Sequence, residues 1–299
     1  MILEGGVWSV MQSLKVDELI ASKTSHDSFL RKVIPRSRAY RHERFEFSPG
    51  ANLTMVLDRR DYSQWRVFAG GLRINKKLFH YFNVNPFRFD IIDIGANIGG
   101  YSALFSLEVD VEHFNVHAFE PNTLIIDGLA ENMRRLESSN ITVNAHVNAY
   151  ALGEHKGRLP LKVNENHSGV STFGNTKREF TRTIDVDVST LDSYVAEKNI
   201  DHIDLIKIDV EAFEPSVLFG ARQTIAYLKP AIYFEFQKAW FDTYPDDFIT
   251  EVIYLLSGNG YRFYREARDG MLHPFTMTAR SLKDFQHLNI LAVARPLPN

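Results

Sequence analysis

Lys207, Asp209 and Glu211 occupy alternate positions near the end of the apolar segment DLIKIDVEAFE. Alternate residues of a regular strand point to the same face of a sheet, so these three side chains are expected to lie together. A carboxylate within hydrogen-bond reach of a hydroxyl can accept its proton as a general base. Asp209 is therefore the first candidate for a catalytic base.

Lys207 and Glu211 each have more than one interpretation. Lys207 can orient Asp209 or bind a polar substrate, and a structural salt bridge at the sheet edge explains it equally well. Glu211 can bind sugar hydroxyls or a divalent cation. Two acids alone are a weak metal signature, because a site for a hard cation needs more oxygen ligands. The sequence therefore predicts no metal.

A glycine-rich loop follows the apolar run of IIDIGANIGGYS, which extends from Ile91 to Ser102. Gly95 opens this loop; a glycine lets a ligand approach the backbone, and the N–H groups of the next helix point at that ligand. The pattern is typical of a nucleotide-type cofactor loop, although an ordinary strand-to-helix turn is the alternative. Asn97 stands where the dinucleotide fingerprint has its second glycine, which disfavours a nicotinamide cofactor.

An acid closes the next apolar segment, VHAFEPN, at Glu120. A carboxylate at the end of the second strand can accept hydrogen bonds from both ribose hydroxyls of an adenosine. A solvated charge at a strand end is the alternative when Glu120 is taken alone. Together with the glycine loop it indicates an adenosine site, which nicotinamide-dependent oxidoreductases share.

Further polar residues are candidates for binding the substrate. His167, Ser171 and Thr172 lie in a long polar segment and suit hydroxyl recognition, although surface turn residues have the same composition. Glu235 ends a later apolar segment, PAIYFEFQ, at the edge of the sheet where ligands bind. It is a candidate second acid.

From Phe89 onward, predicted strands alternate with predicted helices, which indicates an α/β fold with a mostly parallel, twisted sheet covered by helices on both faces. A polar insertion at about 157–182 is too long for a bare loop and is expected to contain a hairpin. The tail of the chain is expected to add antiparallel strands. The core strands are expected at 90–94, 115–119, within 141–153, around 205–208 and at 230–237, and helices are expected from about 99, at 122–136 and at 214–227.

Residues 1–85 are expected to form an N-terminal extension or cap, with residues 86–299 as the catalytic domain. The extension contains an amphipathic segment around Val7–Leu14, and a hairpin is predicted around the SerProGly turn at 48–50. The basic cluster between Arg31 and Arg44 could bind an anionic substrate, but a solvated face is the more common explanation. The extension also leaves open a non-catalytic role as a partner protein.

The composition excludes several classes of function. The 299 residues include no cysteine, which rules out disulfides, thiolate metal sites and cysteine nucleophiles. The net charge of -3 gives no electrostatic reason to expect nucleic acid or an anionic membrane. No secretory signal or apolar stretch of membrane-spanning length is evident, so a cytoplasmic protein is expected.

Taken in order, the motifs DIGANIGGYS, AFEPN, HSGVST, VSTLD, IDLIKIDVEAFE and FEF resemble those of the FkbM-type methyltransferases over roughly residues 60–295. The resemblance implies a class I, Rossmann-like methyltransferase fold with S-adenosyl-L-methionine as cofactor. It places Lys207, Asp209 and Glu211 at the transfer site. One departure is Ala212, where the family commonly has glycine. The implied cofactor contacts are Asp93, Gly95, Ala96, Asn97 and Gly99 near the methionine part, Glu120 with Pro121 at the ribose, and Ala151 and Leu152 beside the adenine.

These observations predict an S-adenosylmethionine-dependent O-methyltransferase that acts on a hydroxyl of a sugar, glycan or polyhydroxylated natural product. A nicotinamide-dependent oxidoreductase and a non-catalytic methyltransferase-fold partner protein remain as alternatives. The expected partner is the hydroxyl-bearing substrate, with no nucleic acid and no membrane span. The sequence predicts no particular oligomeric state.

Overall fold

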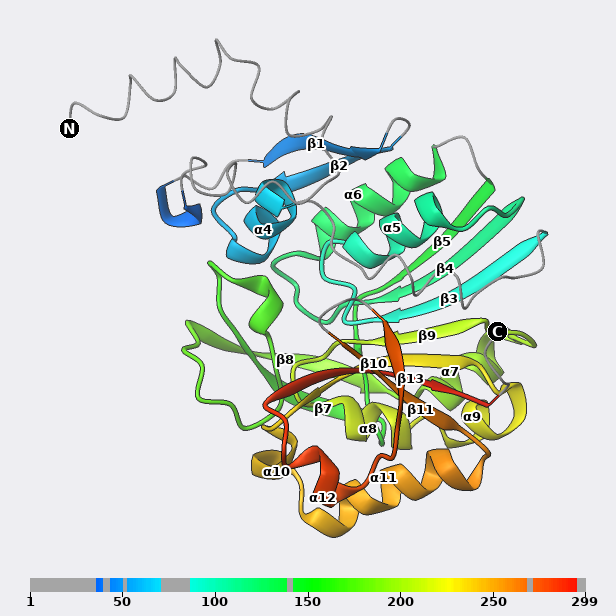
Figure 1. Ribbon diagram of the computed structural model, residues 1–299. Helices are drawn as coiled ribbons and strands as arrows, with labels where there is room; N and C mark the ends of the chain where they lie inside the picture. The colour runs from blue at the N-terminus through cyan, green and yellow to red at the C-terminus, as the bar shows by residue number, and fades with distance from the viewer. Residues whose placement is uncertain are drawn as a thin grey trace.

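A central eight-stranded sheet organises the computed structural model, which describes residues 36–39, 44–50, 53–70, 87–138, 142–267 and 271–294 (Figure 1). Its strand order is β12-β11-β13-β10-β9-β3-β4-β5. The five strands from β10 to β5 are mutually parallel, whereas β13, β11 and β12 join by antiparallel pairing. The strands are β3 (Arg88–Ile94), β4 (His113–Phe119), β5 (Thr142–Asn148), β9 (Leu205–Ile208), β10 (Ala231–Gln237), β11 (Arg262–Glu266), β12 (Leu272–Phe275) and β13 (His287–Val293).

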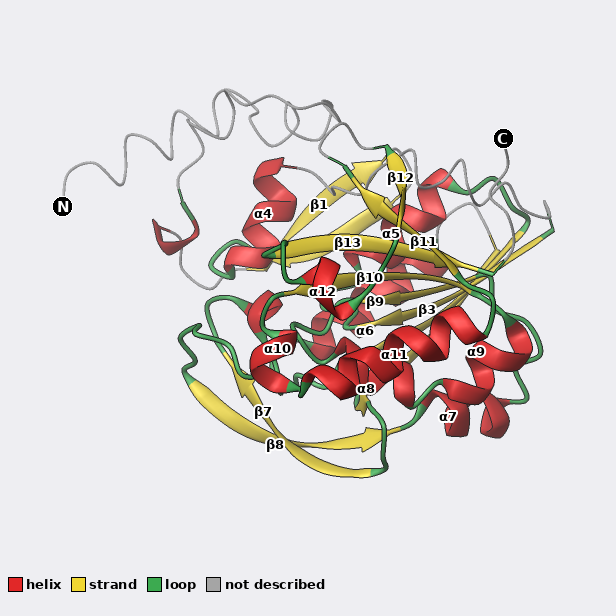
Figure 2. Cartoon of the chain, turned by 60° about the horizontal axis from the view of Figure 1, so that its bottom comes forward, coloured by secondary structure: helices red, strands yellow, loops and turns green. Residues whose placement is uncertain are grey.

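Helices cover both faces of this sheet (Figures 1 and 2). One hydrophobic core packs α5 (Gly100–Glu108) and α6 (Ile126–Glu137) against one face. A second core packs four further helices against the other face. These are α7 (Leu191–Lys198), α8 (Glu214–Phe219), α9 (Arg222–Leu228) and α11 (Asp246–Gly258), with the short helices α10 (Trp240–Thr243) and α12 (Ala279–Leu282) nearby.

The parallel strands have continuous apolar sequences because helices cover both faces of the sheet, so side chains on either face are buried. In β3, Ile91 belongs to the core under α5 and α6, whereas Ile92 and Ile94 belong to the opposite core. All three are at most 1% exposed. The structure therefore confirms the predicted α/β methyltransferase-type fold, including its antiparallel C-terminal strands.

The polar insertion forms most of a separate three-stranded sheet with the order β6-β8-β7. Strands β7 (Gly157–Val163) and β8 (Arg182–Ser189) pair antiparallel as a hairpin, and β6 (Ala151–Leu152) lies parallel to β8. The connection between β7 and β8 contains the short 3₁₀ helix η3 (Ser168–Val170). The hairpin thus extends beyond the expected boundary at residue 182.

The described part of the N-terminal region contains η1 (Ser37–Ala39), a hairpin of β1 (Arg44–Gly50) and β2 (Leu53–Asp58), and α4 (Tyr62–Gly70). This hairpin packs on α6, where the Asn132 side chain accepts a hydrogen bond from Val56 N at 2.6 Å and donates one to Val56 O at 3.1 Å. The expected amphipathic segment around Val7–Leu14 and the basic residues Arg31, Lys32 and Arg41 lie outside the described residues.

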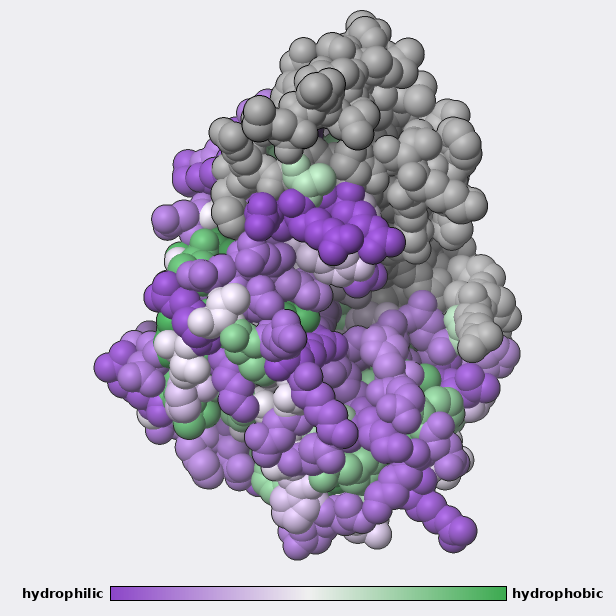
Figure 3. All heavy atoms as spheres, turned by 90° about the vertical axis from the view of Figure 1, so that its left-hand side faces the viewer, coloured by the Kyte–Doolittle hydropathy of each residue, from purple (hydrophilic) through white to green (hydrophobic). Residues whose placement is uncertain are grey.

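The surface seen on the side of α4 is mostly hydrophilic, with apolar residues scattered among polar ones (Figure 3). Within the described ranges, no helix has both the length and the apolar character required to cross a bilayer.

Candidate active site

A cavity of about 1070 Å³ opens where β3, β9 and β10 end and β13 begins. Its walls include the loop after β3, Asp209 and Glu211 after β9, Glu235 on β10 and His287 on β13. Helix α4 forms a further wall. This is the carboxyl edge of the parallel strands, where open α/β sheets bind their ligands.

A second cavity of about 80 Å³ adjoins the first on the side of β4. Gly95, Asn97, Asp209 and Glu211 line both cavities, so the two meet at the loops that follow β3 and β9. Glu120 lines only the smaller cavity, whose other walls are mostly apolar, whereas Glu235 and His287 line only the larger one.

Gly95 fixes the loop after β3 in place. Its φ is 74°, and a Cβ added there would lie 1.9 Å from the carbonyl oxygen of Asp209. The N–H groups of Gly95 and Ala96 both donate to the Phe119 carbonyl at 3.0 Å, which joins this loop to the end of β4. The loop is therefore held between the ends of β4 and β9.

Glu120 is held by the same loop. Its carboxylate accepts hydrogen bonds from Asn97 N and Asn122 N, each at 2.9 Å, and the residue is only 6% exposed. Burial raises the pKa of Glu120 to about 7, against the lowering effect of these two backbone donors. The carboxylate lines the smaller cavity.

Two aromatic residues that sequence reasoning missed complete the smaller cavity. The rings of Phe173 and Phe213 lie 4.8 Å apart between centroids. Pro121, Ala151 and Leu152, which were predicted as cofactor contacts, also line this cavity. The sequence signal that could have found Phe213 is its position in VEAFE, two residues after Glu211.

Asp93 and Gly99 lie behind the predicted cofactor site and line neither cavity. Asp93 is fully buried; its carboxylate accepts a hydrogen bond from Ser102 Oγ at 2.7 Å and pairs with Lys207 Nζ at 3.1 Å. Gly99 has φ 82°, and a Cβ there would lie 2.4 Å from the Met133 side chain on α6. Its conformation therefore serves helix packing.

Lys207 contacts both the loop after β3 and the loop after β9. It is 2% exposed, and its ammonium lies 3.0 Å from Gly95 O and 3.8 Å from an Asp209 carboxylate oxygen. Burial lowers the pKa of Lys207, but the nearby carboxylates, Asp93 first, outweigh it and raise that pKa above its ordinary value. Lys207 is therefore a fixed positive charge beside Asp209.

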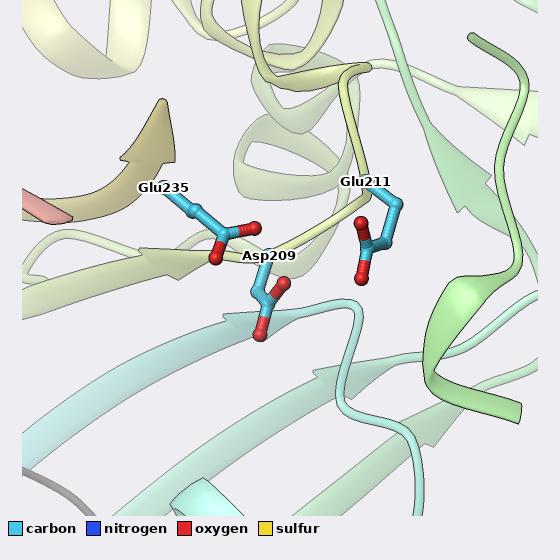
Figure 4. A group of neighbouring side chains, drawn as sticks. All are labelled: Asp209, Glu211 and Glu235. Atoms are coloured by element: carbon cyan, nitrogen blue, oxygen red, sulfur yellow. The ribbon is translucent and has the colours of Figure 1, made fainter. Parts of the chain in front are cut away.

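Asp209, Glu211 and Glu235 bring carboxylate oxygens within 4.8 Å of one another (Figure 4). Burial raises the pKa of Asp209 to about 7; Lys207 opposes this rise, and Glu235 and Glu211 add to it. Arg178 pairs with Glu211 at 2.7 Å, and His287 Nδ1 lies 2.9 Å from Glu235. Because Arg178 and His287 already bind two of the acids, the cluster alone is not evidence for a metal.

A model of the methyltransferase FkbM domain matches residues 93–263 of the chain. The chain belongs to the FkbM methyltransferase family. No curated protein gives a significant match to its sequence.

Several solved structures resemble this FkbM protein at low identity. The FkbM methyltransferase of Methylobacillus flagellatus KT is 17% identical, with a TM-score of 0.46 over 95% of this chain, which spans 60% of that protein. M. jannaschii TYW2 in complex with AdoMet is 12% identical, with a TM-score of 0.39 over 85% of this chain and 86% of that one. Aeropyrum pernix fibrillarin with bound S-adenosyl-L-methionine is 11% identical, with a TM-score of 0.37 over 73% and 74%.

The backbone after Asp209 has an unusual conformation at two residues. Glu211 and Ala212 both have positive φ, 53° and 74°. L-residues other than glycine adopt this left-handed region at a cost. The conformation of Ala212 is one that favours glycine, the residue expected at this position from the resemblance.

The predicted substrate-binding residues of this FkbM protein do not all lie in one cavity. His167 and Glu235 line the larger cavity. Ser171 lines the smaller cavity, where its hydroxyl donates to Ser168 O at 2.8 Å. Thr172 is 1% exposed and lines neither cavity; its hydroxyl donates to Glu211 O, so it supports the backbone of the acidic loop.

Two walls of the larger cavity come from outside the matched domain. Tyr62, Trp65 and Arg66 of α4 lie on one side, and His287 and Asn289 of β13 lie on another. The hydrogen bond to Glu235 raises the pKa of His287. No motif in the sequence marks these residues, because their place depends on how distant segments pack.

Proposed function

We propose that this FkbM-family protein is an O-methyltransferase that transfers the methyl group of S-adenosylmethionine to a hydroxyl of a sugar, glycan or polyhydroxylated natural product. The observation that carries this proposal is the position of Asp209, which lines both the smaller and the larger cavity. A base at this junction reaches a hydroxyl in one cavity beside a cofactor in the other. Membership of a methyltransferase family supports the same cofactor.

The residues of the smaller cavity fit S-adenosylmethionine. Glu120 offers a buried carboxylate to the ribose hydroxyls, and Phe173 and Phe213 offer apolar faces to the adenine. The backbone around Gly95 and Asn97 leads from this cavity into the larger one, as the methionine part requires. When bound, the cofactor supplies a methyl group on a positively charged sulfur.

The protein's own contribution is alignment and removal of a proton. Holding the acceptor oxygen in line with the methyl group supplies much of the acceleration through orientation. Asp209 would accept the hydroxyl proton, and its pKa near 7 suits a general base at neutral pH. Lys207 would hold Asp209 in place, while Glu211, Glu235 and His167 would contact the acceptor.

Calorimetry with S-adenosylmethionine and S-adenosylhomocysteine tests this proposal, with NADH fluorescence titration as the counter-test. Binding of the two sulfur compounds and no binding of NADH is the expected result. Radiolabelled S-adenosylmethionine incubated with a panel of glycans and small metabolites then identifies the acceptor class. Failure of both sulfur compounds to bind would refute the proposal.

A further inference from the structure

The start of α4 is hydrogen-bonded to the loop that carries His167, although more than 100 residues separate the two segments in sequence. Tyr62 N donates to Asn166 O at 2.8 Å. Ser63 Oγ accepts a hydrogen bond from Gly169 N at 2.9 Å. A Cβ on Gly169 would lie 2.4 Å from Ser63 Oγ, so a larger residue there would require the Ser63 side chain to move.

Asp61 is central to this contact because its carboxylate serves both segments. One oxygen accepts the N–H of Gln64 at 3.0 Å, which caps the first turn of α4. The other oxygen accepts the N–H of Ser168 at 2.6 Å. Asp61 is 3% exposed, so both bonds are shielded from water.

The same loop reaches the cofactor side of the site. The Asn97 amide donates to Ser168 Oγ at 3.0 Å, and Asn97 N donates to the Glu120 carboxylate. Ser168 and Gly169 both line the smaller cavity. A chain of hydrogen bonds therefore runs from Asp61 through Ser168 and Asn97 to Glu120.

We propose that Asp61 is a positioning residue, which fixes the loop at 166–169 against Asn97 and thereby sets the affinity for the cofactor. The inference rests on the proposed function. It makes α4 part of the catalytic unit, although α4 lies outside the matched domain. A helix cap alone would need only the bond to Gln64.

Asp61→Ser separates the two roles of the carboxylate. Serine is a good N-cap, so α4 keeps its cap, but its shorter side chain cannot also reach Ser168 N. We expect amide hydrogen exchange of peptides covering 164–171 to accelerate about tenfold or more, and the Kd for S-adenosylhomocysteine to rise about tenfold. Ser63→Ala removes only the bond from Gly169 and is expected to change both quantities in the same direction, by less.

Asp204→Asn is the matched control. Asp204 is half-buried and, like Asp61, accepts a backbone N–H, from Asp90 at 2.8 Å, but it lies just before β9, at the opposite end of the sheet from the cavity. It is expected to change neither the exchange of 164–171 nor the Kd. If Asp61→Ser does not fold, Ser63→Ala provides the test.

Unchanged exchange and unchanged affinity in the Asp61 and Ser63 variants would overturn the inference. Faster exchange with an unchanged Kd would refute the link to the cofactor. A wild-type protein that does not bind S-adenosylhomocysteine refutes the proposed function, and with it the link to affinity, whereas hydrogen exchange still shows whether Asp61 holds the loop.

Discussion

The carbonyl oxygen of Asp209 leaves no room for a side chain at Gly95, because an added Cβ would lie 1.9 Å away. These residues end neighbouring parallel strands, and Asp209 N also donates to Ile94 O at 3.0 Å. The candidate base and the cofactor loop are thus in direct backbone contact. Gly95 is needed to assemble the site as well as to admit a ligand.

Gly95→Ala is therefore expected to lower the free energy of unfolding by about 2–4 kcal/mol, through the positive φ and the backbone clash together. Gly128→Ala is the matched control, since a Cβ on Gly128 in α6 meets nothing within 4 Å. That helical substitution is expected to stabilise the protein by up to about 1 kcal/mol. Urea denaturation measures both values; equal stability of the two variants would contradict the steric argument.

Ala212→Gly should be neutral or stabilising by up to about 1 kcal/mol. The change relieves a left-handed conformation worth about 1–2 kcal/mol and removes a fully buried methyl group worth about 0.8 kcal/mol. Ala103→Gly, in α5 and 1% exposed, should instead cost at least about 1 kcal/mol. Thermal unfolding compares the two, and a clear loss of stability in Ala212→Gly would show that this loop is not strained.

Glu120→Gln should weaken binding of S-adenosylhomocysteine by about tenfold to a hundredfold, because a neutral amide replaces a carboxylate acceptor. The carboxylate is the form that accepts both ribose hydroxyls, and its pKa in the free protein is about 7. Wild-type affinity should therefore rise as the pH increases from 6 to 8, whereas the variant should lose this dependence. Calorimetry at several pH values measures both, with the exposed Glu112→Gln at the other end of the β4 segment as control.

Asp209→Asn should lower the rate of methyl transfer by about 10²–10⁴-fold while leaving the Kd for S-adenosylhomocysteine within about threefold. The base must be deprotonated, so the wild-type rate should fall about tenfold per pH unit below its pKa of about 7. Transfer of radiolabelled methyl groups measures the profile. An unchanged rate of methyl transfer in Asp209→Asn would remove Asp209 from this role, and Asp204→Asn, at the other end of the same strand, should leave the profile unchanged.

Much of the fold could be predicted because its signals are local. The apolar run at 90–94 became β3 at Arg88–Ile94, and the segment expected at 230–237 became β10 at Ala231–Gln237. Two-sided burial produces such runs whatever the strand order. Glu120 and Asp209 were found because each directly follows a buried strand.

The rest of the site depends on packing between distant segments, which no local pattern reports. Asp61 meets Ser168 across a separation of 107 residues. Gly99 resembles a cofactor glycine in sequence, yet it has a φ of 82° and the nearest neighbour of a Cβ there is the Met133 side chain on α6. Thr172 resembles a substrate contact in sequence. In the structure its hydroxyl donates to Glu211 O and accepts a hydrogen bond from Gly174 N.

Strand β13 lies between β10 and β11, inside the sheet, although it is the last described strand to be synthesised. Until it emerges from the ribosome, the edge of β10 has no partner on that side, and the cavity lacks the wall formed by His287 and Asn289. An exposed strand edge on a growing chain can pair with other chains. Completion of the pocket therefore waits for β13, and truncation before residue 287 would remove one wall of the cavity and expose an aggregation-prone edge together.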